Sequence, residues 1–111
     1  MIDFKKKLRE ERAKKLVIEP NEGNGGRQCY FSHKGKDYWA DMTDFGNEAL
    51  VKKTTNEILG YDVEVMIFPA NGREIESYSD LACYRTSQDN FTDEYLKECI
   101  TEFMEDIDHE S

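Results

Sequence analysis

The segment Tyr61-Asp-Val-Glu-Val-Met-Ile-Phe68 constrains the fold more than any other part of the chain. Its apolar residues are mostly β-branched or aromatic, and Pro69 and the dipeptide Asn71-Gly72 follow closely behind it. Asn-Gly between two such runs is the strongest short-range signal for a β-hairpin. We therefore predict a central strand over 61–69, ended by Pro69, that pairs antiparallel with 73–78 through this turn.

A second hairpin is predicted further toward the N-terminus. Gln28-Cys-Tyr-Phe-Ser-His33 and Asp37-Tyr-Trp-Ala-Asp-Met42 are strand-like segments joined by a short turn that contains glycine. Residues 81–86 complete the hairpin group near the C-terminus, and residues 16–18 read as a short strand stopped by Pro20.

Three helices are predicted from capping residues. Asp3 caps a basic first helix that reaches about residue 15, and Thr92 caps an acidic last helix that reaches residue 108. A middle helix over 48–59 has Asn47 as its cap and ends at Gly60. The last helix has the clearest apolar stripe, with spacings of four, three and four residues between its members, Leu96, Ile100, Phe103 and Ile107.

These elements predict one α+β domain over residues 1–111, an antiparallel sheet built from hairpins with helices packed on one face. A chain of 111 residues holds one domain and buries a core without a metal or disulfide. The three cysteines, Cys29, Cys83 and Cys99, stand at wide spacings, so we expect reduced thiols, no metal site and no cofactor.

The charge distribution favours a basic partner. The chain has a formal net charge of −9, but residues 1–15 contain seven basic and three acidic side chains. The remaining body is strongly acidic and repels phosphate backbones, which excludes direct nucleic-acid binding by the body. The basic first helix has two interpretations: a Lys/Arg arm that contacts nucleic acid, or a helix that lies against this body or remains solvated, which is the one we expect.

The acidic side of the last helix is the first candidate binding surface. Glu94, Glu98, Glu102 and Asp106 form an uninterrupted i, i+4 row, with a rise of about 6 Å between neighbours. Like charges at this spacing destabilise a helix by about 0.2–0.5 kcal/mol per pair. Two interpretations remain open: a solubilising surface, or a carboxylate row that docks on a basic groove or imitates a phosphate backbone.

The hairpin at 28–42 supplies the second candidate surface. Its alternation places Cys29, Phe31, Tyr38, Ala40 and Met42 on one face, as a core. The other face receives Tyr30, Trp39, Asp37 and Asp41. Trp39, Asp37 and Asp41 are therefore candidate partner-binding residues, although partial cover of Trp39 by a helix is the simpler expectation.

Catalytic chemistry finds little support in the sequence. Cys29 and His33 lie on the same predicted strand face, as a cysteine nucleophile and its base would, but so would a buried thiol and a histidine near a turn. The loop Gly23-Asn-Gly-Gly26 lacks the spacing of phosphate-binding loops. We expect no enzyme; a small thiol enzyme that uses Cys29 is the least favoured hypothesis.

Four short segments between residues 65 and 85 form a recognisable pattern: Val65-Met-Ile-Phe-Pro69, Asn71-Gly72, Ser77-Tyr-Ser-Asp-Leu81 and Tyr84-Arg85. This pattern resembles that of small uncharacterised phage and prophage accessory proteins. It implies a phage or mobile-element origin, in which small acidic proteins often bind and block host proteins, including defence nucleases. No apolar run has the length of a membrane span and no secretory signal is seen, so we expect the cytoplasm of the host cell.

Two functional hypotheses follow. The first is a non-enzymatic acidic interaction protein that blocks a basic, nucleic-acid-binding host protein. The alternative is a small-ligand or nucleotide binding module, with a pocket between sheet and helices near Tyr30, Trp39 and Arg85.

Overall fold

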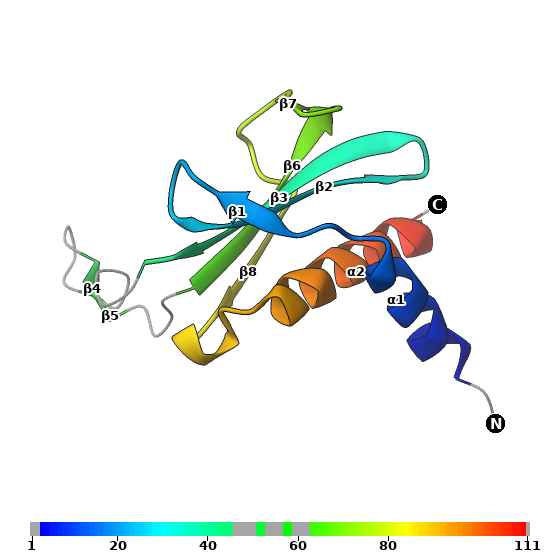
Figure 1. Ribbon diagram of the computed structural model, residues 1–111, viewed down its shortest axis with the longest axis horizontal. Helices are drawn as coiled ribbons and strands as arrows, with labels where there is room; N and C mark the ends of the chain where they lie inside the picture. Colours follow the sequence, from blue (N-terminus) through cyan, green and yellow to red (C-terminus); the bar gives the residue numbers. More distant parts are fainter. Residues whose placement is uncertain (1–2, 46–50, 53–56, 59–62, 111) are drawn as a thin grey trace.

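The computed structural model describes residues 3–45, 51–52, 57–58 and 63–110. The fold is α+β, as predicted: a curled antiparallel sheet of hairpins with two helices packed against it (Figure 1). In chain order the elements are α1 (Phe4–Lys14), β1 (Glu19–Asn21), β2 (Gly26–His33), β3 (Lys36–Asp44), β4 (Val51–Lys52), β5 (Glu57–Ile58), β6 (Val63–Asn71), β7 (Glu74–Ile75), β8 (Ala82–Thr86), the 3-10 helix η2 (Gln88–Asn90) and α2 (Asp93–Glu110).

The main sheet has the order β1-β2-β3-β6-β7, and β8 also pairs with β6. Since β7 pairs with residues 70–71 of β6 and β8 with residues 63–67, these two short strands share one edge of β6. Both predicted hairpins are confirmed, and β6 is the predicted central strand. The turn of the second hairpin lies one residue later than predicted, at Gly72-Arg73, because Asn71 pairs with Glu74.

The predicted end of this strand at Pro69 is wrong, because β6 continues to Asn71. The Pro69 carbonyl accepts a hydrogen bond from the Glu76 amide at 3.0 Å, so the Pro69 nitrogen also faces that edge. There it lies between the stretches that pair with β8 and β7, so its missing N–H costs no ladder bond. The pairing strand is shorter than predicted, since β7 covers only Glu74–Ile75.

Two other sequence-based boundaries are corrected. The first short strand is not 16–18 but Glu19–Asn21, and Pro20 lies inside it. Proline is tolerated there because β1 is the edge of the sheet.

The predicted helix over 48–59 is wrong where the structure describes it, because β4 and β5 pair antiparallel and Val51 is the register partner of Ile58. Its other residues, including Asn47 and Gly60, lie outside the described residues.

The core lies between the sheet and α2. The inner sheet face buries side chains from β2, β3 and β6, and these include Cys29, Phe31, Tyr38, Ala40, Met42, Val63, Val65 and Ile67. The predicted stripe of α2 covers them: Leu96, Ile100 and Phe103 are buried and Ile107 is half-buried. The Phe103 ring meets Tyr38 edge-on, with 5.0 Å between centroids.

Helix α1 begins at its predicted cap, where Asp3 accepts hydrogen bonds from the amides of Lys5 and Lys6. It packs on α2 rather than directly on the core, and none of its residues is buried. In Figure 1 it crosses α2 and its N-terminal end projects away from the sheet.

Candidate functional site

The acidic row lies on the solvent side of α2, as predicted. Glu94, Glu98, Glu102 and Asp106 are all exposed, while the apolar stripe faces the core. The helix begins as expected, because the Tyr95 amide donates to the Thr92 hydroxyl at 3.1 Å. The capped start fixes the register that keeps the four carboxylates outside.

The row is not flat. At about 100° per residue, four residues advance by about 40° beyond a full turn, so Glu94 and Asp106 point about 120° apart. The groove between α1 and α2 is lined at the first end of the row by Glu94 and Glu98. At the other end, Asp106 lines a groove beside the β2–β3 turn and β8, where Asp106 and Glu102 contribute to the raised pKa of Tyr84 after its burial.

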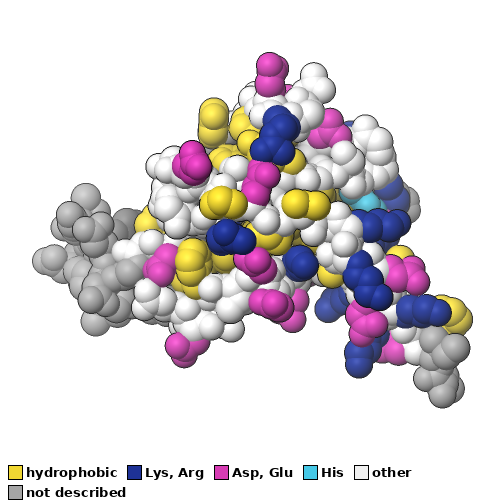
Figure 2. All heavy atoms as spheres, in the orientation of Figure 1, with side chains coloured by type: hydrophobic (Ala, Val, Ile, Leu, Met, Phe, Trp, Pro, Cys, Tyr) yellow, Lys and Arg dark blue, Asp and Glu magenta, His cyan; other side chains and the backbone are white. Residues whose placement is uncertain are grey.

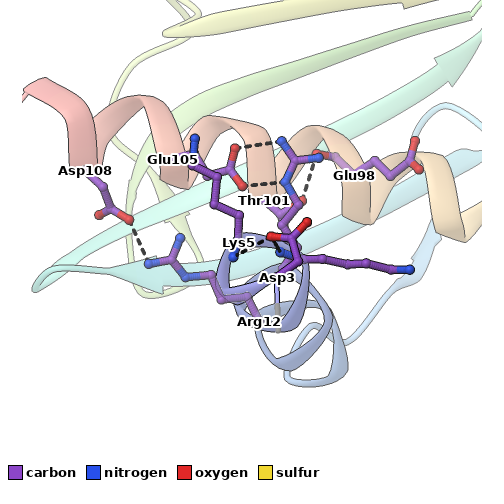
Figure 3. A network of polar contacts seen from close by, with 9 residues as sticks. Asp3, Lys5, Arg12, Glu98, Thr101, Glu105 and Asp108 are labelled. Atoms are coloured by element: carbon purple, nitrogen blue, oxygen red, sulfur yellow. Dashed lines mark hydrogen bonds and ion pairs between the residues drawn. The ribbon is translucent and has the colours of Figure 1, made fainter. Parts of the chain in front are cut away.

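A second set of acidic residues on α2 is paired with α1. The Arg9 guanidinium binds Glu105 in a two-pronged ion pair, and Arg12 Nη2 lies 2.7 Å from Asp108 Oδ2 (Figure 3). The hydrogen bond and charge of Arg9 lower the pKa of Glu105. Lys and Arg side chains gather over α1 in Figure 2. The ion pairs of Arg9 and Arg12 show that this basic helix is bound to the acidic body of the same chain.

Asp108 is the centre of a wider cluster. Besides Arg12, it binds His33 Nε2 at 2.8 Å and Lys34 Nζ at 3.1 Å. Its pKa is held well below the ordinary range by hydrogen bonds, first from Arg12 and then from His33. The cluster ties α1, the β2–β3 turn and the C-terminal end of α2 together.

The four carboxylates of the acidic row differ from Glu105 and Asp108. None of the four forms an ion pair with another residue in the described part of the chain. Glu98 and Glu102 contribute only through space to the raised pKa of Arg9. The acidic row is therefore a surface of uncompensated charge on a helix whose Asp93, Glu105 and Asp108 are ion-paired.

The aromatic candidate surface lies on the other side of the sheet. Trp39 is half-buried and stacks between Tyr30 and Phe68, with centroid distances of 6.3 and 5.3 Å. Its indole N–H donates to the Gln28 side chain at 2.9 Å. The cover of Trp39 thus comes from neighbouring strands, and the expectation of a covering helix is wrong for the described helices, because α2 packs on the opposite face.

The two carboxylates beside Trp39 are satisfied within the fold. Asp37 accepts hydrogen bonds from the Ser32 hydroxyl and the Gly72 amide, which lower its pKa in that order. Asp41 accepts from the Asn21 and Asn24 side chains at 2.9 and 3.0 Å. The seven predicted binding residues therefore form two separate surfaces. Asp37 and Asp41 are hydrogen-bonded by neutral groups of the fold, whereas the acidic row projects its carboxylates into solvent.

The cysteines have the environment of structural thiols. Cys29 and Cys99 are buried, and desolvation raises their pKa values to about 11 and about 12. Burial also raises the pKa of Cys83. A nucleophilic cysteine needs a lowered pKa, so the geometry gives no support to catalysis by Cys29 and His33. Among the described residues no three His, Cys, Asp or Glu side chains are grouped as metal ligands.

Thiol labelling tests this assignment. In the native protein at pH 7.5, we expect a disulfide reagent such as Ellman's reagent to modify half-buried Cys83 slowly and to leave Cys29 and Cys99 unmodified for hours. All three should react within minutes in denaturant. Rapid native labelling of Cys29, located by peptide mass spectrometry, would contradict the assignment and restore the thiol-enzyme hypothesis.

The predicted ligand pocket shares only some of its residues with a cavity in the structure. A cavity of about 480 Å³ lies between α1, β2 and α2, and Tyr30 is among its lining residues. Trp39 and Arg85 do not line it. Its basic lining residues are Arg12, Lys15 and His33. The sequence does not reveal that Arg12 and His33 meet at Asp108, because they lie 96 and 75 residues away from it.

Comparison with protein-family models, with curated proteins and with solved structures finds no match to this chain. Among the described residues, no helix combines the length and apolar character required to cross a membrane.

Proposed function

We propose that this chain is a non-enzymatic interaction protein whose acidic row binds a basic, nucleic-acid-binding host protein and blocks it. The observation that carries the proposal is the exposure of four carboxylates on α2 without an ion pair in the described part of the chain. The resemblance to phage accessory proteins supports a host target of this kind.

Stability alone does not account for this arrangement. Three like-charged i, i+4 pairs each cost about 0.2–0.5 kcal/mol. The basic residues of α1 relieve Glu105 and Asp108 but form no ion pair with the acidic row. A basic partner would relieve the same repulsion on binding, so the free protein holds charge that a complex can use.

The spacing of the row indicates the form of the partner surface. Carboxylates that rise by about 6 Å along α2 are sparser than the phosphates of one DNA strand, at about 3.4 Å along the duplex axis. The row therefore suits a basic groove with a few Lys or Arg contacts rather than a site that requires a complete duplex. Its turn of about 120° favours a groove that curves around the helix.

Neutral substitution is the cleanest test of the row. Lysine at Glu98 and Glu102 would pair with Glu94 and Asp106 along the helix, but it would also repel Arg9, whose raised pKa reflects both glutamates. Glutamine removes the charge without this new repulsion. The test variant is therefore E94Q/E98Q/E102Q/D106N.

The charge-matched control is E22Q/E74Q/D80N/D89N, which removes four exposed carboxylates away from α2.

Each protein is used as bait in a bacterial lysate at about 50 and about 500 mM salt, and a captured basic protein is then purified for affinity measurements. At about 0.4 kcal/mol per exposed charge contact, we expect the test variant to bind at least about tenfold more weakly. The control should bind like the unmodified protein, and high salt should weaken binding.

The control should unfold within about 0.5 kcal/mol of the unmodified protein. The test variant should be more stable by about 0.6–1.5 kcal/mol, because it removes three like-charged pairs, so weaker binding could not be attributed to a weakened fold. Equal affinity of the test variant and the unmodified protein at low salt would refute a role for the acidic row. Equal losses in both variants would show that only the net charge matters.

A further inference from the structure

The cavity between α1, β2 and α2 lies where the basic N-terminal segment meets the acidic body of the molecule. Its volume of about 480 Å³ falls in the range of small-molecule sites. Its lining residues come from the last turn of α1 and the segment after it, the end of β2, and the middle of α2: Arg12, Lys15, Leu16, Tyr30, Phe31, Ser32, His33 and Met104.

The lining contains two cationic residues and one histidine but no carboxylate. Three other grooves on the described surface each include at least two carboxylates, among them Asp106, Glu76 and Glu98. In a chain with a net charge of −9, a concave surface lined by Arg12 and Lys15 without an acidic residue is unusual. Its electrostatic complement is an anion.

The Arg12 guanidinium supplies a second observation. Its Nη2 binds Asp108, but its Nη1 is shielded from solvent and has no hydrogen-bond partner among the described residues. Buried guanidinium donors are rarely left unpaired in folded proteins. Arg12 lines the cavity, so an anion seated beside its guanidinium is a candidate acceptor for this donor.

Asp108 holds Arg12 and His33 beside the cavity but does not cancel all the positive charge of the lining residues. Its carboxylate binds Arg12, His33 and Lys34. Lys15 also lines the cavity and forms no ion pair in the described part of the chain. The carbonyl end of α1 contributes about half a negative charge, which is less than the full positive charge of Lys15.

We propose that this cavity binds the anionic group, a carboxylate or a phosphate, of a small organic molecule. Arg12 and Lys15 hold the anion, and the apolar part of the ligand rests on Leu16, Phe31 and Met104, which are largely buried. This site is separate from the acidic row and does not depend on the proposed function.

The test uses phenyl phosphate and phenylacetate as probes, with inorganic phosphate and neutral benzyl alcohol beside them. Amide chemical shifts of the ¹⁵N-labelled full chain are followed in each titration. We expect saturable shifts at residues 12–16, 30–33 and 104 with at least one aromatic anion, and weaker or no saturation with benzyl alcohol. The two anions distinguish a phosphate site from a carboxylate site.

A matched pair of variants makes the result specific. Lys15 lines the cavity and Lys14 does not, although both are exposed and adjacent. We expect Lys15→Gln to weaken anion binding about threefold to fivefold and Lys14→Gln to change it less than about twofold. Arg12→Gln should abolish saturation, and the amide spectrum of that variant shows whether the fold is kept.

Several results would overturn the proposal. These are no saturable shifts at millimolar probe, shifts located outside the cavity, and equal losses in the Lys14 and Lys15 variants, which would indicate attraction by net charge alone. The E94Q/E98Q/E102Q/D106N variant should bind the anion as the unmodified protein does, so failure of this site and failure of the acidic row are distinguishable.

Discussion

Replacing Ile100 with alanine is expected to lower the free energy of unfolding by about 3–4 kcal/mol. The side chain is fully buried in the centre of the α2 stripe, against the inner face of the sheet. Loss of three carbons there removes apolar burial and leaves a cavity that the close-packed strands fill only partly. Urea or guanidinium denaturation followed by circular dichroism measures the change.

The control is Glu102→Ala, two residues further along the same helix. Glu102 is exposed and forms no ion pair in the described part of the chain, so its substitution should not lower stability. It should raise stability by up to about 1 kcal/mol, because it removes two like-charged i, i+4 pairs. A loss below about 1 kcal/mol for Ile100→Ala would contradict the packing of α2 on the sheet.

Replacing Asp108 with asparagine is expected to cost about 2 kcal/mol at pH 7. The substitution removes the charge partner of Arg12, His33 and Lys34, and Arg12 is left largely buried without a carboxylate. Breaking a fully buried pair costs about 3–5 kcal/mol, and the value is smaller here because 29% of the Asp108 side chain is exposed. Chemical denaturation measures this loss, and increased solvent exchange of the α1 amides locates it.

The same substitution should change the dependence of stability on pH. The folded-state pKa of Asp108 is lowered from the ordinary value of 3.8. Its carboxylate therefore stabilises the fold at pH above about 4, and this contribution is lost as the pH falls through the lower folded-state pKa. The unmodified protein should lose more stability than Asp108→Asn between pH 5 and pH 2.

Asp106→Asn is the matched control, because Asp106 is exposed on the same turn and has no ion pair in the described part of the chain. Its effect on stability at pH 7 should stay within about 0.5 kcal/mol. Equal effects of the two asparagine variants would show that Asp108 acts through general helix charge and not through its cluster.

The elements predicted correctly are those whose signals are local. The hairpin at Asn71-Gly72, the Asp3 and Thr92 caps and the stripe from Leu96 to Ile107 each express a rule that acts within about a dozen residues. Burial and exposure along α2 followed from helical periodicity alone.

The errors arose where tertiary context decides. Pro69 and Pro20 read as strand ends, yet each lies where a missing N–H is tolerated, which only the pairing pattern shows. The segment with Val51 and Ile58 read as a helix from its caps, while the described residues form a small ladder. Short segments of this kind take their structure from their surroundings.

The candidate site shows the same division. The exposure of the acidic row could be predicted, but its separation from Trp39 depends on which sheet face α2 covers. The cluster around Asp108 could not be predicted, because its members come from α1, the β2–β3 turn and α2. Such a cluster becomes visible only once the chain has folded.

The absence of buried residues in α1 has a consequence for local stability. The helix is held chiefly by ion pairs to Glu105 and Asp108, and screening shortens the reach of such interactions from about 10 Å at 0.1 M salt to about 3 Å at 1 M. Undocking of α1 is therefore an equilibrium of its own, with a smaller free energy than global unfolding. Because α1 and its C-cap supply Arg12 and Lys15, an anion in the proposed cavity would be thermodynamically linked to this equilibrium. Docking of α1 and binding of the anion would stabilise each other. The fraction of molecules in which α1 is docked would therefore rise with the ligand concentration.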